Sequence, residues 1–203
     1  MWITRRKTMD LAAKGQIVPD RSLLKTPEQI KAIQESADLN TAVLDHVAAH
    51  IRKGMSTEEI DRLVYDYTTQ HGGIPAPLNY QGFPKSVCTS VNNVVCHGIP
   101  DENEILKEGD IINVDVSTIL NGYYSDASRM FTIGQISPEA EKIVRVTKEC
   151  VELGLKAAKH GDIWEISLMP SVPMPGRMAF LSWKISAAME SAWNFMKILM
   201  SAM

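Results

Sequence analysis

A predicted β-hairpin over residues 110–134 constrains this chain more than any other segment. Apolar and polar residues alternate over residues 112–118, and Asn121-Gly122 follows as a strong signal for a two-residue hairpin turn. This turn would pair Leu120 with Tyr123, Ser117 with Asp126, and Asp115 with Ser128. The register then decides which side chains share a face, because side chains alternate along a strand with a period of two.

The predicted register places Asp115 and Asp126 on one face as diagonal neighbours, roughly 7–8 Å apart at Cα. Ser117 shares that face, whereas Val114 and Val116 point to the opposite side and suit a core. Two carboxylates so close repel each other unless a cation or hydrogen-bond donors offset the repulsion. The pair is therefore a candidate site for one or two metal ions, although hairpin aspartates are also often solvated or bonded to turn amides.

The composition is typical of a soluble globular protein, with 22% charged and 45% hydrophobic residues. The 203 residues suffice for one substantial core or two small lobes. The net charge of −3 gives no indication of binding to nucleic acid or an anionic membrane, and no apolar run approaches transmembrane length. Three cysteines without zinc spacing fit a reducing compartment, so we expect a cytoplasmic protein. Residues 1–25 lack a secretory signal and are expected to form a poorly ordered extension.

Capping residues and apolar spacing predict three helices. The first begins at Thr26-Pro27-Glu28 and ends at Gly54. The second begins with a capping box at Ser56–Glu59 and ends at residues 71–73, and the third begins at residues 137–139. The expected buried stripes are Ile30, Ile33, Ala37, Leu44, Val47 and Ile51; Ile60, Leu63, Val64 and Tyr67; and Ile143, Val146, Cys150, Leu153 and Ala157.

Residues 75–100 are rich in turn residues and contain two predicted short strands, Ser86–Val91 and Val94–His97, joined by a turn at Asn92-Asn93. His97 would end the second strand, where it either faces a cavity or is satisfied by loop backbone. The order of the elements predicts an α+β domain with helices packed on one face of an antiparallel sheet.

Two segments resemble type I methionine aminopeptidases: NYQGFPKSVCTSVNNVVCHGIP, residues 79–100, and GDIINVDVSTILNGYYSDASRMFTIG, residues 109–134. The histidine motif, both aspartate motifs and their spacing agree, and the resemblance extends over residues 26–159. It implies an α+β pita-bread fold whose N-terminal half, a catalytic domain over residues 26–159, is intact. It also implies a dinuclear metal site that removes the initiator methionine from new proteins.

The resemblance implies roles for six residues. Asp115 would be a terminal, chelating metal ligand, Asp126 would bridge both ions, and His97 would hydrogen-bond the substrate near the scissile amide. The methionine side-chain pocket would be lined by Tyr80, Phe83 and Cys88. Two divalent ions of Co, Mn, Fe or Zn would lower the pKa of a bridging water and polarise the carbonyl. The implied partners are nascent polypeptide N-termini near the ribosome, for a monomer that binds neither nucleic acid nor membrane.

The chain departs from the family after Lys159. The family has three further metal ligands there, a histidine in a GHGIG motif and two glutamates, and a second catalytic histidine in an FHExP motif. No histidine follows His160 in this chain, and residues 160–203 form an aberrant tail rich in methionine and tryptophan. The hairpin alone supplies too few ligands for a dinuclear site.

Our hypothesis for this tail is a one-nucleotide frameshift after Lys159. Shifting the codons of residues 189–197 by one nucleotide forces one glycine and two glutamates, and it permits H-G-I-G-L-E-F-H-E, the missing motif. The same shift over residues 184–188 permits E-D-I-C-G directly before it. Loss of one C from DNA encoding the family's K-P-W-G-H-L-G-D-I can give the sequence of residues 159–167. We therefore expect a methionine aminopeptidase by descent whose C-terminal half is missing or non-native, with exposed core surface and no activity in this form.

Two alternatives remain open. A proline-specific aminopeptidase or prolidase would share the pita-bread fold, but such enzymes usually carry a larger N-terminal domain, and VCHGIP at residues 95–100 fits the methionine enzyme better. A non-enzymatic pita-bread binding protein would use the methionine-rich tail as a contact surface. Sequencing the gene and transcript, with mass spectrometry of the protein, separates a frameshift from a genuine tail.

Inserting one nucleotide directly after the codon of Lys159 should restore family-like sequence and metal-dependent peptidase activity. The restored second half would supply the missing ligands and bury apolar surface left by the first half. The measurement is release of methionine from short peptides, with Asp126→Asn in the restored gene as the inactive control. An immediate stop codon, or a soluble product without metal-dependent activity, would contradict the frameshift.

Overall fold

The computed structural model describes residue 13 and residues 25–157. Nearly all of the predicted extension, residues 1–25, lies outside these residues, as do the predicted tail, residues 160–203, and the frameshift junction. Among the described residues no helix is long and apolar enough to cross a bilayer.

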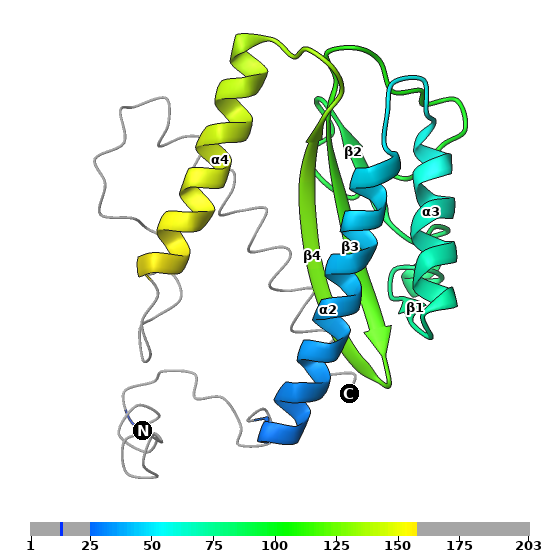
Figure 1. Cartoon of the computed structure of the whole chain (residues 1–203), viewed down its shortest axis with the longest axis vertical. Coiled ribbons are helices and arrows are strands. Elements are labelled where there is room, and N and C mark those ends of the chain that lie inside the picture. The colour runs from blue at the N-terminus through cyan, green and yellow to red at the C-terminus, as the bar shows by residue number, and fades with distance from the viewer. Residues whose placement is uncertain (1–12, 14–24, 158–203) are drawn as a thin grey trace.

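Figure 1 shows a twisted antiparallel sheet with two helices, α2 and α3, running alongside it. The central strand is β3, Ile111–Leu120, which pairs along one edge with β4, Tyr123–Thr132. Its other edge is shared by β2, Cys88–Val91, and the two-residue β1, Ile74–Pro75. The predicted α+β arrangement is confirmed, with β1 as a strand that the sequence did not predict.

The β3–β4 hairpin has the predicted register. Asn121 (φ 51°) and Gly122 (φ 83°) form the turn, and both positive values match the type I′ turn favoured between twisted strands. The pairs are Leu120 with Tyr123, Ser117 with Asp126, and Asp115 with Ser128. Val114 and Val116 are buried in the core against α2 and α3, as expected.

The three predicted helix starts are confirmed. The first helix, α2, spans Pro27–His50 and begins with a capping box between Thr26 and Gln29. The second, α3, spans Thr57–Gln70 and begins with the capping box of Ser56 and Glu59. The third, α4, spans Pro138–Ala157 and stands apart from the α2–α3 layer in Figure 1. The predicted end of the first helix at Gly54 is wrong, because the backbone turns extended at Ile51 (φ −62°, ψ 130°).

The predicted apolar stripes are partly wrong. Ile30 and Ile143 are 47% and 44% exposed, and Ala37 is exposed as well. Val146 of α4 is buried, whereas the side chains of Cys150, Leu153 and Ala157 lie outside the described residues. The face that α2 turns to the hairpin includes buried polar residues, which apolar periodicity does not detect.

Those polar residues tie α2 to the central strand. Asn40 is 1% exposed; its Nδ2 donates to the Val116 carbonyl at 3.0 Å, and its Oδ1 accepts from the Thr118 hydroxyl at 2.7 Å. One turn earlier, the Ser36 hydroxyl lies 3.2 Å from the Thr118 carbonyl, to which it donates. Because α2 can satisfy these groups in only one register, the seam fixes how the helix lies on the hairpin.

The predicted strand Val94–His97 is absent, although the turn at Asn92-Asn93 forms. Val94 and Val95 are 42% and 82% exposed, so this stretch has no apolar surface to pack on, and His97 adopts a left-handed backbone (φ 54°). The strand predicted from Ser86 starts later, at Cys88. The Ser86 amide instead donates to the Asp61 carboxylate.

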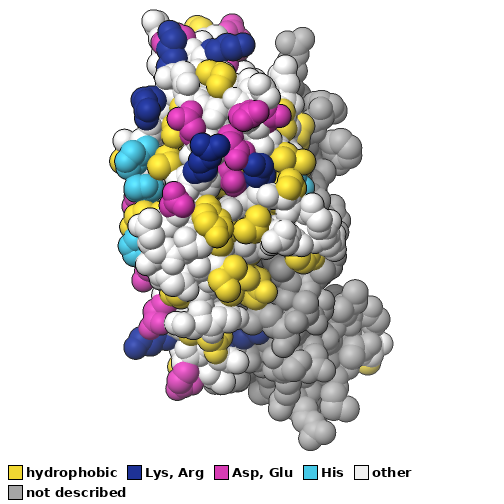
Figure 2. Space-filling model, turned by 90° about the vertical axis from the view of Figure 1, so that its right-hand side faces the viewer, with side chains coloured by type: hydrophobic (Ala, Val, Ile, Leu, Met, Phe, Trp, Pro, Cys, Tyr) yellow, Lys and Arg dark blue, Asp and Glu magenta, His cyan; other side chains and the backbone are white. Residues whose placement is uncertain are grey.

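Three histidines form a row with Tyr67 on the outer surface of α2 and α3. Ring centroids lie 4.3 Å apart for His46 and His50, 4.6 Å for His46 and Tyr67, and 4.1 Å for Tyr67 and His71. Figure 2 shows histidine side chains (cyan) gathered along one edge of its view. Burial and the neighbouring imidazoles lower the pKa of His46. The row packs the two helices together and takes no part in the site described below.

Asn40→Ala should lower the free energy of unfolding by about 2–3 kcal/mol, because it leaves the Thr118 hydroxyl and the Val116 carbonyl buried without this partner. The measurement is urea unfolding followed by circular dichroism. Asp38→Ala, at an exposed position on the same helix, is the matched control and should stay within about 0.5 kcal/mol of the parent. Equal stabilities for the two variants would contradict the structural role given to the seam.

Candidate functional site

The hairpin brings Asp115 of β3 and Asp126 of β4 to one face of the sheet, opposite the buried valines. The Ser117 hydroxyl lies directly across from Asp126 and donates to its Oδ1 at 2.6 Å. Asp115 is half-buried and Asp126 is exposed. The pair therefore combines the partly buried carboxylate of Asp115 with the exposed carboxylate of Asp126, which is held in place by the Ser117 hydroxyl.

An open cavity of ≈ 460 Å³ lies over this face of the hairpin. Its lining comes from the segment after β1, from β2, from the loop after β2 and from the hairpin: Pro77, Tyr80, Gln81, Gly82, Phe83, Pro84, Cys88, His97, Ile99, Asp115, Ser117 and Asp126. All six residues proposed from the sequence thus surround one cavity. Their individual roles remain predictions.

His97 reaches the cavity because of the glycine that follows it. A Cβ on Gly98 would lie 1.9 Å from the Thr89 carbonyl oxygen, so only glycine allows the loop to press against β2. A hydrogen bond stabilises this close approach: the Thr89 amide donates to the Gly98 carbonyl at 2.9 Å. The left-handed backbone of His97 lies directly before this contact.

Burial and like charge shape the electrostatics of the site. Burial, and then the neighbouring Asp126 carboxylate, raise the pKa of Asp115 to about 7. Burial, followed by the charges of Asp115, Cys96 and Asp126, raises the pKa of the Cys88 thiol to about 12. Cys88 therefore stays a neutral thiol near pH 7, which suits a pocket wall better than a metal ligand or nucleophile.

The two carboxylates have the chemistry expected for part of a metal site. A divalent cation between them would offset their repulsion, and carboxylate oxygens suit hard or borderline divalent ions. Within the described ranges there is no cluster of three or more His, Cys, Asp or Glu side chains able to hold a metal. The donor set present here thus fits one side of a metal site, and Asp115 and Asp126 are its candidate ligands.

Sequence reasoning missed several lining residues. The Ser117 donor could have been found, because the hairpin register already placed it opposite Asp126. Gln81 lines the cavity from η2, Tyr80–Gly82, with a left-handed backbone (φ 48°) that no sequence pattern signals. Ile99, which is 54% exposed, lines the cavity from the position directly after Gly98.

Residues 31–168 match the model of metallopeptidase family M24. The chain belongs to this family. Methionine aminopeptidase A of Synechocystis is 47% identical over 142 residues, which cover 70% of this chain and 56% of that protein. The Escherichia coli methionine aminopeptidase is 42% identical over 139 residues, covering 68% of this chain and 53% of that protein. The chain thus spans about half the length of these relatives.

Two solved structures agree with the fold. The methionine aminopeptidase of Rickettsia prowazekii superposes with a TM-score of 0.63 at 40% identity, over 64% of this chain and 52% of that one. An Xaa-Pro dipeptidase from Bacillus anthracis matches at 21% identity with a TM-score of 0.58, which shows a common fold alone. The predicted family resemblance and pita-bread fold are confirmed, and the family is one of metal-dependent peptidases.

Asp115→Asn should stabilise the metal-free chain at pH 8 by about 2–4 kcal/mol. A carboxyl whose pKa is raised in the fold from 3.8 to about 7 binds its proton more tightly there than in the unfolded chain, so its ionisation costs stability as the pH rises through that interval. Asparagine removes this cost, and the difference should vanish near pH 4.

Urea unfolding in the presence of a chelator at pH 4, 6 and 8 measures this effect. Asp66→Asn, the same substitution at an exposed position of α3, is the control and should leave the pH profile unchanged. A profile for Asp115→Asn that parallels the parent would show that Asp115 ionises freely in the folded chain.

Proposed function

We propose that this chain carries the first half of the active site of a methionine aminopeptidase, which removes the N-terminal methionine from nascent proteins. The observation that carries this proposal is the single cavity that collects Asp115 and Asp126 with the four other residues of the predicted site. Relatives that are methionine aminopeptidases at 42–47% identity support it.

The cavity suits a methionine side chain. Its wall combines Tyr80 and Phe83 with the neutral thiol of Cys88, which lies next to Asp115 in the sheet. A flexible, polarizable thioether packs well against aromatic rings and sulfur. With the side chain in this pocket, the scissile amide would lie near His97, whose imidazole would hydrogen-bond it and hold it in place.

When bound, two divalent ions of Co, Mn, Fe or Zn would supply an activated water and a Lewis acid for the carbonyl. In this proposal Asp115 and Asp126 would both be ligands of these ions. The Ser117 hydroxyl donates to Asp126 at 2.6 Å and would orient this carboxylate as a ligand.

The same proposal makes this form of the chain inactive. The described residues offer two carboxylate ligands, and the sequence has no histidine after His160. The remaining ligands and the second catalytic histidine would come from a second half that residues 160–203 do not encode in this frame. The intact enzyme would act as a cytoplasmic monomer on N-termini emerging near the ribosome.

The 203-residue chain should release no measurable methionine from Met-Ala-type peptides, even with added Mn or Co. Two ligands cannot hold a dinuclear site in working geometry. The assay is methionine release, with the Escherichia coli methionine aminopeptidase under identical conditions as the positive control. Turnover approaching that of the control would show that residues 160–203 rebuild the site.

A further inference from the structure

One wall of the cavity is a segment with little regular structure. Residues 77–84 contribute six of the lining side chains or backbones: Pro77, Tyr80, Gln81, Gly82, Phe83 and Pro84. The bonds within it are local, for example from the Asn79 amide to the Phe83 carbonyl at 2.8 Å. Asn79 and Gln81 both have left-handed backbones (φ 66° and 48°), which cost conformational energy. A segment of this kind needs anchors at its ends to keep its shape.

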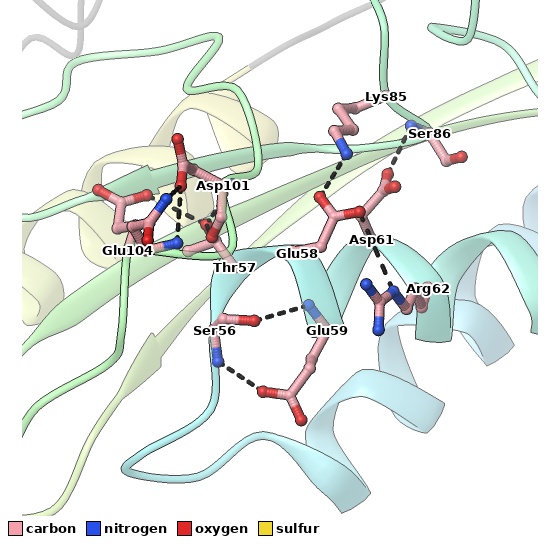
Figure 3. Close-up of polar contacts among 11 residues, drawn as sticks. Ser56, Thr57, Glu58, Glu59, Asp61, Arg62, Lys85, Ser86, Asp101 and Glu104 are labelled. Carbon is pink, nitrogen blue, oxygen red and sulfur yellow. Dashed lines mark hydrogen bonds and ion pairs between the residues drawn. The ribbon is translucent and has the colours of Figure 1, made fainter.

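The anchor at the first end comes from the hairpin, where the Ala76 amide donates to the Ser117 carbonyl at 2.9 Å. The anchor at the second end comes from α3. The Ser86 amide donates to Asp61 Oδ1 at 2.6 Å, and Ser86 and Asp61 are 1% and 9% exposed. Beside it, the Lys85 ammonium pairs with Glu58 one turn earlier on α3 (Figure 3).

Asp61 is an unusual residue for a helix face packed in a core. Its carboxylate is largely removed from water, and this burial is the main cause of its raised pKa, which the Ser86 amide and Lys85 partly offset. Leucine or alanine would meet the packing needs of this helix position without that cost. This cost is understandable if the Asp61 carboxylate holds the Ser86 backbone in place. Ser86 lies two residues before Cys88, which pairs with Asp115 in the sheet.

We propose that Asp61 is a positioning residue for the substrate side-chain pocket, fixing the wall of residues 77–86 relative to Asp115 and Asp126 through the Ser86 amide. The Glu58–Lys85 pair is a second tie at the same point. The inference rests on the proposed function in taking this cavity as the methionine pocket. The alternative is that the hydrogen bond between Ser86 and Asp61 stabilises the whole fold equally and does not order the pocket wall in particular.

The experiment measures wall order directly in the 203-residue chain. Cys88 is partly buried and lines the same cavity as this wall, whereas Cys96 is exposed and serves as an internal reference. N-ethylmaleimide labelling of each cysteine is followed by mass spectrometry for the parent, Asp61→Ala, Asp61→Asn and Asp66→Ala. Asp66 is exposed on the same helix and controls for the loss of an aspartate. Hydrogen exchange of peptides from residues 77–88, α2 and β3 is measured on the same samples.

Asp61→Ala should speed labelling of Cys88 roughly tenfold or more. Loss of a hydrogen bond to a charged group shifts the local opening equilibrium of the wall by about this factor. Labelling of Cys96 should stay as in the parent, and faster exchange should be confined to residues 77–88. Asp61→Asn, which keeps an oxygen acceptor, should lie between the parent and Asp61→Ala. Asp66→Ala should match the parent throughout.

An unchanged Cys88 rate in folded Asp61→Ala overturns the proposal, and so does faster exchange spread equally over α2 and β3. If Asp61→Ala does not fold, Asp61→Asn and Lys85→Met decide, since each should open residues 77–88 selectively. In the frame-restored chain, Asp61→Asn should raise KM for methionyl peptides while kcat stays close to the parent value. A restored chain without any activity would count against the proposed function, while the labelling result would still judge Asp61.

Discussion

The ladder between β3 and β4 is the constraint on which the rest of the structure depends. Ten residues of each strand pair without a bulge, so the identity of the two turn residues sets the face of every side chain in both strands. A slip of one residue would move the valines of β3 into water and the aspartates into the core. Burial of Val114 and Val116, at 0% and 1% exposure, therefore opposes the same slip that would separate Asp115 from Asp126.

The helices depend on that ladder in turn. The α2 helix is held on the hairpin by Asn40 and Ser36, which meet the backbone carbonyls of Val116 and Thr118. Such directional hydrogen bonds fix the position of α2 along the sheet, which apolar contacts alone would specify less strictly. The α3 helix then reaches the loops from its first two turns, where Thr57 bonds the Asp101 carbonyl and Asp61 bonds the Ser86 amide. Hydrogen bonds thus tie α2 to the hairpin and α3 to the pocket wall.

Features that depend on a few neighbouring residues could be predicted from the sequence, and features that depend on distant contacts could not. Capping boxes and the Asn121-Gly122 turn gave correct helix starts and the correct hairpin register, because a few neighbouring atoms determine them. The hairpin register pointed to Asp115 and Asp126, motif resemblance completed the set of six site residues, and the structure gathers all six round one cavity. Failures occurred where distant partners decide: Ile30 has apolar spacing but is exposed, and Asn40 is polar but buried. The stretch 94–97 alternates like a strand, yet it lacks a surface to cover.

The close approach of Gly98 to Thr89 has a consequence for any survey of variants in this protein. A single added methyl group at that position would collide with a carbonyl oxygen and force apart the loop and the strand. The residue displaced first would be His97, its immediate neighbour in the chain. A mutational scan of the frame-restored chain, scored by activity, would accordingly rank Gly98 among the essential positions, although it contributes no functional group. The position of the His97 imidazole therefore depends on Gly98 having no Cβ atom.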